Sequence, residues 1–429
     1  MSLTSAAYQE TKAYPDYRRN FAAGWIHGVF FQMSATFGNI QTVLPAFVTF
    51  LTPSTAVIGL MATIQGIGEI IPQLFTAHLI DGKPRKKHYL LGIITWRWIA
   101  WALLAWLTFQ YGVTHPGLVL TVLIILFGSF SLAGGMGSVI YADIFSRAIP
   151  AQRRGRFVSA RQIGGFALAI LAGWIVKNIL DAEDVFPFPV NFSLIFALSA
   201  ATLAVAFVGF ALIREPVSHA ARQNHSVKEM LRQGTRLVRD NANLRLFLIS
   251  RAVIGMTVGM ASFYVVYARN DLGVSAGAVG LFLTAQMAGA AVSNILWGWL
   301  ADGYGNKTVI VGTMATAGLT AVFALTLPAL YLPAYVVVFI LLGAMLSGWR
   351  IGYNNFVLEM APEKIRAACV AWQNTLIAPV TLLPLIAGAL LSSISFTTIF
   401  VIELGLIAIG LIASLRLKDP RHTPEGICT

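Results

Sequence analysis

The sequence has few charged residues and few cysteines. Asp, Glu, Lys and Arg make up 11% of its 429 residues, whereas soluble domains carry about 25%. The two cysteines, Cys369 and Cys428, are too few for a disulfide framework. No phosphate-binding loop, zinc-ligand spacing or nucleophile elbow occurs in the sequence. We therefore expect no enzyme, no metal site and no cofactor.

Long apolar runs account for most of the chain, since 57% of the residues are hydrophobic. Uncharged runs of about 20 residues are typical of transmembrane helices. They must be helical because lipid offers backbone polar groups no other partner. The sequence predicts an all-α, multi-pass membrane protein with twelve spans, at 21–50, 55–80, 89–112, 117–147, 158–180, 190–213, 244–269, 275–300, 306–327, 333–360, 367–392 and 395–416.

The net charge of +12 reflects membrane topology rather than a nucleic-acid surface. With the N-terminus inside, nearly every loop cation falls on the inner side, and only Lys177 and Arg269 fall outside. Lys and Arg collect in cytoplasmic loops. We therefore expect both termini to be cytoplasmic, a location in the inner or plasma membrane, and no nucleic-acid partner.

The chain divides into two halves of six spans. We expect a cytoplasmic N-terminus (1–20), a first bundle (21–213), a linker with an amphipathic helix (214–243), a second bundle (244–416) and a cytoplasmic tail (417–429). A turn motif occurs once in each half, as LIDGKPRKK at 79–87 and GWLADGYGNK at 298–307. Internal duplication of this kind is typical of secondary transporters.

These features together resemble the major facilitator superfamily over essentially the whole chain. The family's loop reads G-x-L-x-D-R-x-G-R-K, and the second copy keeps Gly298, Leu300, Asp302, Gly305 and Lys307, with Gly303 in place of the arginine. The first copy keeps Leu79, Asp81, Arg85 and Lys86, and PAQRRGR at 150–156 resembles the family's loop between spans 4 and 5. The resemblance implies two pseudo-symmetric six-helix bundles and transport by alternating access.

The resemblance also implies that charges at the inner ends of the helices gate the protein. Asp143 is expected to hold Arg85 or Arg154. The alternative is that these charges only fix topology during insertion. The expected gating residues are Asp81, Arg85, Asp143, Arg154, Asp302, Lys307, Glu359 and Arg366.

Ionisable residues inside spans are costly and mark function. Glu69 in span 2 and Arg97 in span 3 lie at similar depths. Either they form a structural ion pair, or Glu69 carries a coupling proton. His27 in span 1 is a third candidate for proton coupling, with a packing role as its alternative. Glu403 in span 12 has no assigned role.

Arg350 near the middle of span 10 is the main candidate for substrate binding. The family resemblance implies that spans 1, 4, 7 and 10 line the cavity, and a guanidinium binds carboxylate or phosphate with two parallel hydrogen bonds. An ion pair with an acid of another helix is the alternative. The predicted substrate-binding residues are Arg350, Arg251, Tyr353, Asn354, Gln32, Asn39, Trp349 and Tyr264.

The sequence therefore predicts a secondary active transporter. Because arginines outnumber acids in the cavity-lining spans, we expect a small anionic or zwitterionic organic solute, with H⁺ as the coupling ion. The expected partners are that solute, protons and membrane lipids, and the chain is expected to be monomeric. Two alternatives are efflux of amphipathic drugs or metabolites by proton antiport, and a transporter-like receptor or lipid-handling protein without solute turnover.

Overall fold

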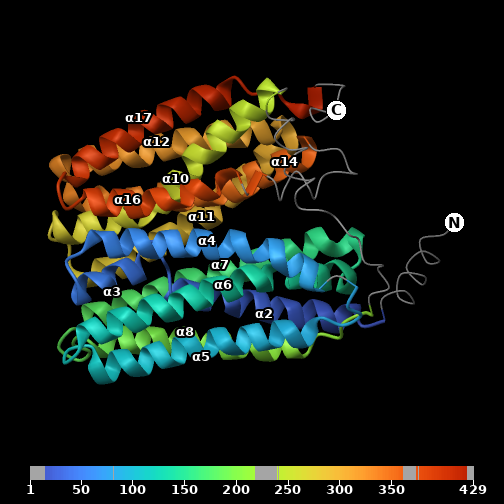
Figure 1. Cartoon of the computed structure of the whole chain (residues 1–429), viewed down its shortest axis with the longest axis horizontal. Coiled ribbons are helices and arrows are strands. Elements are labelled where there is room, and N and C mark those ends of the chain that lie inside the picture. The colour runs from blue at the N-terminus through green and yellow to red at the C-terminus, as the bar shows by residue number, and fades with distance from the viewer. Residues whose placement is uncertain are drawn as a thin grey trace. The chain divides into compact units, whose positions relative to one another are not determined.

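The structure is a computed structural model that describes residues 15–80, 82–217, 239, 241–360, 373–374 and 376–422. The described residues form helices and loops and contain no strand (Figure 1). The predicted amphipathic helix at 226–238 lies outside them. Within these residues, ten helices are long and apolar enough to cross a membrane. The prediction of an all-helical, multi-pass membrane protein is therefore confirmed.

The helices of the first half follow the predicted spans closely. They are α2 (Tyr17–Phe37), α3 (Val43–Leu51), α4 (Thr55–Ile80), α5 (Lys87–Tyr111), α6 (Pro116–Ala148), α7 (Arg154–Asp181) and α8 (Val190–Ala211). The first predicted span, 21–50, is two helices rather than one. Between them, Asn39 Oδ1 accepts hydrogen bonds from the backbone N–H groups of Gln41 (2.8 Å) and Thr42 (3.0 Å). An Asn side chain that bonds nearby backbone in this way competes with helix continuation.

The second half contains α10 (Ala242–Asn270), α11 (Ala276–Tyr304), α12 (Asn306–Leu330), α13 (Val336–Gly348), α14 (Asn354–Met360), α16 (Leu383–Leu390) and α17 (Phe396–Leu415). A π-helical turn, Trp349–Tyr353, joins α13 to α14. The two turn motifs also share a backbone feature, since each contains a glycine with positive φ, 73° at Gly82 and 88° at Gly305. That conformation is costly for side chains with a Cβ atom.

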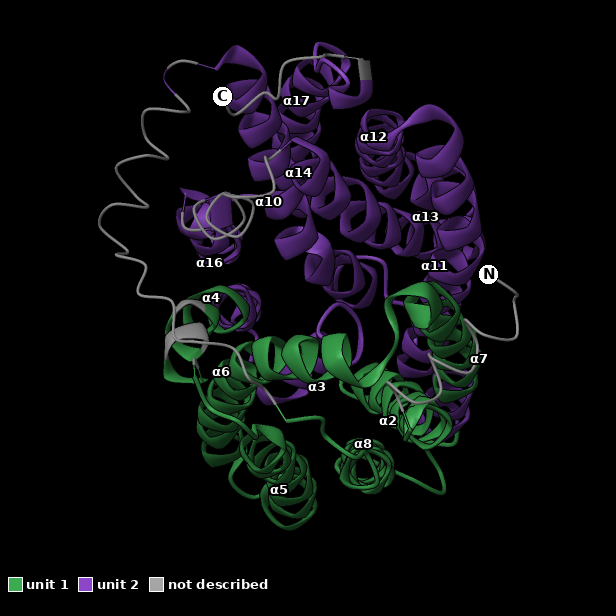
Figure 2. Cartoon of the chain, turned by 90° about the vertical axis from the view of Figure 1, so that its right-hand side faces the viewer, with its two compact units in different colours: residues 1–38, 68–172, 182–223 green, residues 39–67, 173–181, 224–429 purple. Residues whose placement is uncertain are grey.

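The chain forms two compact units that do not coincide with its two halves (Figure 2). Unit 1 comprises residues 1–38, 68–172 and 182–223, and unit 2 comprises residues 39–67, 173–181 and 224–429. Helices α4 and α7 therefore contribute to both units. In unit 1, α8 packs against α2 and α5; in unit 2, α11 packs against α13, and α17 packs against α10 and α12.

Close helix crossings in unit 2 depend on residues without a Cβ atom. A Cβ at Gly59 of α4 would lie 2.1 Å from the carbonyl oxygen of Pro384 in α16. A Cβ at Gly280 of α11 would lie 2.1 Å from the backbone nitrogen of Lys177 in α7. Small residues allow membrane helices to approach at van der Waals distance, which drives their association in lipid.

The two halves share a hydrogen-bonded pair at corresponding positions. Asn20, at the start of α2, donates to the carbonyl of Arg214 (3.0 Å) and accepts from its N–H (2.8 Å). Asn243, at the start of α10, donates to the carbonyl of Lys418 (3.1 Å) and accepts from its N–H (2.7 Å). Both asparagines are buried. Each pair ties the first helix of a half to the chain just after its last helix, as an internal duplication predicts.

Candidate functional site

Unit 1 holds a cluster of polar side chains inside its membrane helices. The Arg161 guanidinium of α7 donates a 2.5 Å hydrogen bond to the Tyr141 hydroxyl of α6. The Tyr141 ring lies 5.6 Å from the ring of His27 in α2. His27 is buried, and its Nδ1 lies 2.9 Å from the carbonyl of Ala206. In this contact Nδ1 carries a hydrogen and donates it to the carbonyl oxygen.

Arg97 of α5 lies against aromatic rings in the same unit. Its guanidinium carbon is 3.9 Å from the centre of the Phe130 ring and 5.0 Å from that of Phe31. Cation–π contacts of this kind gain strength where water is excluded. Glu69 of α4 interacts with Arg97 electrostatically, although the Glu69 side chain is exposed. Arg97 therefore interacts electrostatically with Glu69 and with His27, and His27 also interacts with Arg161.

Unit 2 also places arginines inside the membrane helices. Arg251 of α10 donates a 3.2 Å hydrogen bond from Nη2 to the side-chain oxygen of Asn374. Its Nη1 is buried and has no hydrogen-bond partner within the described part of the chain. Arg350 lies in the π-helical turn, is exposed, and makes no ion pair with a described residue. Single π-turns occur frequently at functional sites.

The structure separates the predicted substrate-binding residues into two groups. Arg350, Asn354, Trp349, Arg251 and Gln32 are exposed or partly exposed. Tyr353, Tyr264 and Asn39 are instead buried in structural hydrogen bonds. The Tyr353 hydroxyl lies 2.6 Å from Ser250 Oγ, and the Tyr264 hydroxyl donates to Glu403 Oε2 at 3.1 Å.

A partly buried ionic network lies at one end of unit 1. Asp143 of α6 pairs with Lys86 (3.0 Å) and with Arg147. Glu215 accepts backbone N–H groups of Lys86 and Lys87, both at 2.8 Å, at the first turn of α5. A carboxylate there is stabilised by the free N–H groups and the helix dipole.

Two residues expected to pair with Asp143 lie elsewhere. Arg85 is exposed and bonds no described residue. Arg154 donates to the carbonyl oxygens of Ile149 (3.1 Å) and Ser146, after the end of α6 and in its last turn. Asp81, the acid of the first turn motif, lies outside the described residues.

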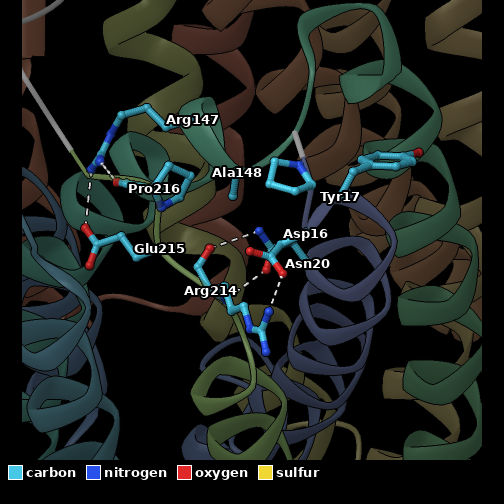
Figure 3. A pocket seen from close by; sticks show the side chains of 9 residues that line it. Asp16, Tyr17, Asn20, Arg147, Ala148, Arg214, Glu215 and Pro216 are labelled. Atoms are coloured by element: carbon cyan, nitrogen blue, oxygen red, sulfur yellow. Dashed lines mark hydrogen bonds and ion pairs between the residues drawn. The ribbon is translucent and has the colours of Figure 1, made fainter. Parts of the chain in front are cut away.

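The network borders a small cavity of about 150 Å³. Figure 3 shows Glu215 and Arg147 bonded to each other on one side of it, and Asp16, Asn20 and Arg214 connected on the other. Arg214 Nη1 pairs with Asp16 at 2.8 Å. Every charged lining group has an opposite partner, so this cavity offers no free charge for a ligand.

Unit 2 has a comparable contact after its own last helix. Arg421 donates to Glu359 Oε1 from Nε (3.1 Å) and Nη2 (2.8 Å), and to the carbonyl of Asp302 at 3.3 Å. The hydrogen bond to Glu359 raises the pKa of Arg421. Lys307 is partly exposed, and Arg366 lies outside the described residues.

Sequence reasoning missed several of these residues, of which Arg161 matters most. It lies within the predicted fifth span, at 158–180, so its signal was a charge inside an apolar run. Glu215 and Arg421 were missed because each follows the last helix of its half. Only the fold brings them back to the ends of α5 and α14.

Comparisons with known proteins agree with this architecture. The family described as Major Facilitator Superfamily matches residues 25–265 and 247–427. No curated protein sequence matched the chain. Similar solved structures include a mutant of the nucleoside transporter NupG (17% identity, TM-score 0.68, 93% of this chain and 100% of that one). A second is a D-xylose-proton symporter (14% identity, TM-score 0.67, 95% of this chain and 98% of that one). A third is a POT family transporter in complex with 5-aminolevulinic acid (11% identity, TM-score 0.66, 92% of this chain and 95% of that one).

Proposed function

Because the chain belongs to the Major Facilitator Superfamily, it is a multi-pass membrane transporter, and we propose that it is a proton-coupled secondary transporter of a small organic anion or zwitterion. Alternating access between two membrane bundles is the general mechanism of such transporters. The proposed location is the inner or plasma membrane, with both termini cytoplasmic.

The observation that carries the proposal is the partnering of the intramembrane arginines. Arg161 bonds a tyrosine hydroxyl, and Arg251 bonds an asparagine amide. Arg350 has no carboxylate partner among the described residues. An unpaired cation inside a membrane protein is costly, so it is retained where a substrate supplies the opposite charge. A carboxylate satisfies a guanidinium with two parallel, charge-assisted hydrogen bonds.

The similar structures have titles that name several kinds of solute. They mention a nucleoside transporter, a D-xylose-proton symporter and a complex with 5-aminolevulinic acid. At 11–17% identity these neighbours share only the fold. Of the named solutes, the zwitterion 5-aminolevulinic acid carries the carboxylate that the arginines require. A proton symporter among the neighbours supports coupling to H⁺.

Uptake into proteoliposomes under an inward proton gradient tests the proposal. We expect labelled 5-aminolevulinic acid to accumulate, and D-xylose and a nucleoside to accumulate much less. Loss of uptake when the gradient is collapsed supports proton coupling. Equal transport of all three solutes, or efflux of amphipathic dyes without uptake of the zwitterion, would contradict the proposed substrate class.

Two variants test whether Arg350 contacts the substrate. Arg350→Ala is expected to lower kcat/KM for the zwitterion at least tenfold, because one charge-assisted hydrogen bond contributes about 1.5–3 kcal/mol. Arg350→Lys keeps the charge and loses the two-pronged geometry, so it should retain part of the activity. Lys177→Ala is the matched control, since Lys177 pairs only with Asp181 on its own helix. Unchanged affinity and transport in Arg350→Ala would remove Arg350 from the site.

A further inference from the structure

Glu403 of α17 is a buried acid without a cation beside it in the described part of the chain. Its side chain is 2% exposed. Oε2 accepts a 3.1 Å hydrogen bond from the Tyr264 hydroxyl of α10. Oε1 is buried and has no described hydrogen-bond partner. The Tyr264 ring stacks on Phe400, one turn before Glu403, with centroids 4.7 Å apart and ring planes 8° apart.

The described helices that pack against α17 present no charge to Glu403. Helix α17 packs against α10 and α12. Between its first turn, with Lys307, and its end at Leu330, α12 contains no ionisable residue, and Glu403 is the only one in α17. From α10, the guanidinium of Arg269 is directed at the Phe50 ring, 5.0 Å away.

The remaining titratable groups nearby are neutral phenols. Tyr335 donates a 3.0 Å hydrogen bond to the carbonyl of Tyr264. The Tyr267 ring lies 5.5 Å from that of Phe400. Among the described residues, Tyr264 supplies the single hydrogen bond to the acid. Glu403 therefore sits among aromatic rings and hydroxyl groups, and none of the residues that the structure describes is its counter-ion.

An ionised carboxylate in this position would have to give up its hydration for one neutral hydrogen bond. Burial of an unpaired charge costs several kcal/mol, whereas burial of a neutral, partly bonded acid costs much less. The acid form also fits the contacts, because Oε2 can accept from Tyr264 while Oε1 carries the proton. We propose that Glu403 and Tyr264 form a proton-binding site, protonated in this conformation, whose proton is exchanged during transport.

The site differs in kind from the other intramembrane acid. Glu69 is exposed and has a cation, Arg97, with which it interacts electrostatically. Glu403 can release its proton only if water reaches the contact between α10 and α17, and the proton then passes to that water and leaves a carboxylate. Proton release is thereby tied to separation of these two helices. The coupling role rests on the proposed proton-coupled transport, while protonation rests on the geometry alone.

Infrared spectroscopy of the full-length protein in lipid tests protonation without any substrate. At neutral pH we expect a carboxylic-acid C=O band that is lost in Glu403→Gln. Tyr264→Phe should shift the band, since the C=O group loses its donor. Glu359→Gln is the control and should leave it unchanged, because that carboxylate is paired with Arg421. Identical spectra for the wild type and Glu403→Gln would overturn the proton site.

Transport measurements test the coupling role. Glu403→Gln mimics the protonated acid and cannot release a proton. We therefore expect its gradient-driven accumulation of 5-aminolevulinic acid to be at least tenfold lower than that of the wild type. Exchange of labelled for unlabelled solute, which needs no net proton movement, should be retained. Accumulation at the wild-type level would overturn the coupling role. A wild type that moves none of the tested solutes would overturn the proposed function and the coupling role with it, whereas the infrared band would still decide whether Glu403 binds a proton.

Discussion

The paired asparagines give the most direct test of how each half is held together. Asn20 makes two hydrogen bonds, of 2.8 and 3.0 Å, to the backbone of Arg214. Asn20→Ala removes both. Each bond contributes a net value of about 1 kcal/mol, so we expect the free energy of unfolding to fall by about 2 kcal/mol. For a cooperative unit of about 200 residues, this corresponds to a fall in Tm of about 4–8 °C.

Asn243→Ala should produce a similar fall, because Asn243 bonds the backbone of Lys418 in the same way. The two sites share no partner, so the double variant should lose about the sum of the single losses. Asn20→Asp keeps the hydrogen-bond acceptor and loses the donor, so its Tm should lie between those of Asn20→Ala and the wild type.

Loss of helical circular dichroism on heating, at a fixed scan rate in one detergent, measures these changes. Asn178→Ala is the control, since the exposed Asn178 side chain bonds only the carbonyl of Trp174 in its own helix. If Asn20→Ala and Asn243→Ala melt at the wild-type temperature, the side-chain-to-backbone pairs do not stabilise the halves. If the Tm of Asn178→Ala falls as far as the Tm of those two variants, the loss of stability does not come from these pairs.

Two further variants test packing and helix capping. Gly59→Val should lower the Tm, because a Cβ there meets the carbonyl oxygen of Pro384 at 2.1 Å. Gly92→Val is the control and should leave the Tm unchanged, because no atom lies within 4 Å of its Cβ. An equal Tm for the two variants would refute the close crossing. Glu215→Gln should lower the free energy of unfolding by about 1–2 kcal/mol, because a neutral amide is a weaker partner for the backbone N–H groups of Lys86 and Lys87 and for the helix dipole. An unchanged melting curve for Glu215→Gln would show that the cap contributes little.

The sequence predicted the helices well because the membrane imposes a simple rule on them. Lipid requires apolar runs of fixed length with internally bonded backbone, and α4 begins and ends where its span was placed, at 55 and 80. The break between α2 and α3 was not predicted. It depends on the Asn39 side chain bonding its own backbone, a local competition that hydropathy does not report.

The candidate site was predictable only in part. Charges inside apolar runs identified Arg97, Arg251 and Arg350, since such charges stand out in composition. Their partners did not stand out, because Asn374 and Tyr141 are ordinary polar residues until the fold places them beside an arginine.

Spacing along a helix does not show burial either. Tyr353 follows Arg350 by three residues and yet points into the core toward Ser250. Asp143 was expected to hold Arg85 or Arg154, but it pairs with Lys86, the neighbour of Arg85 in sequence.

Two helices, α4 and α7, pass from one unit to the other without interruption. The border in α4 falls between residues 67 and 68, and the border in α7 between 172 and 173. Pro72 lies in α4 just past the first border, where it leaves the carbonyl of Gly68 without its helical hydrogen bond. The second border is at Gly173. Sharp helix kinks arise mostly at proline, so α4 has a place to bend close to the residue at which it passes between units.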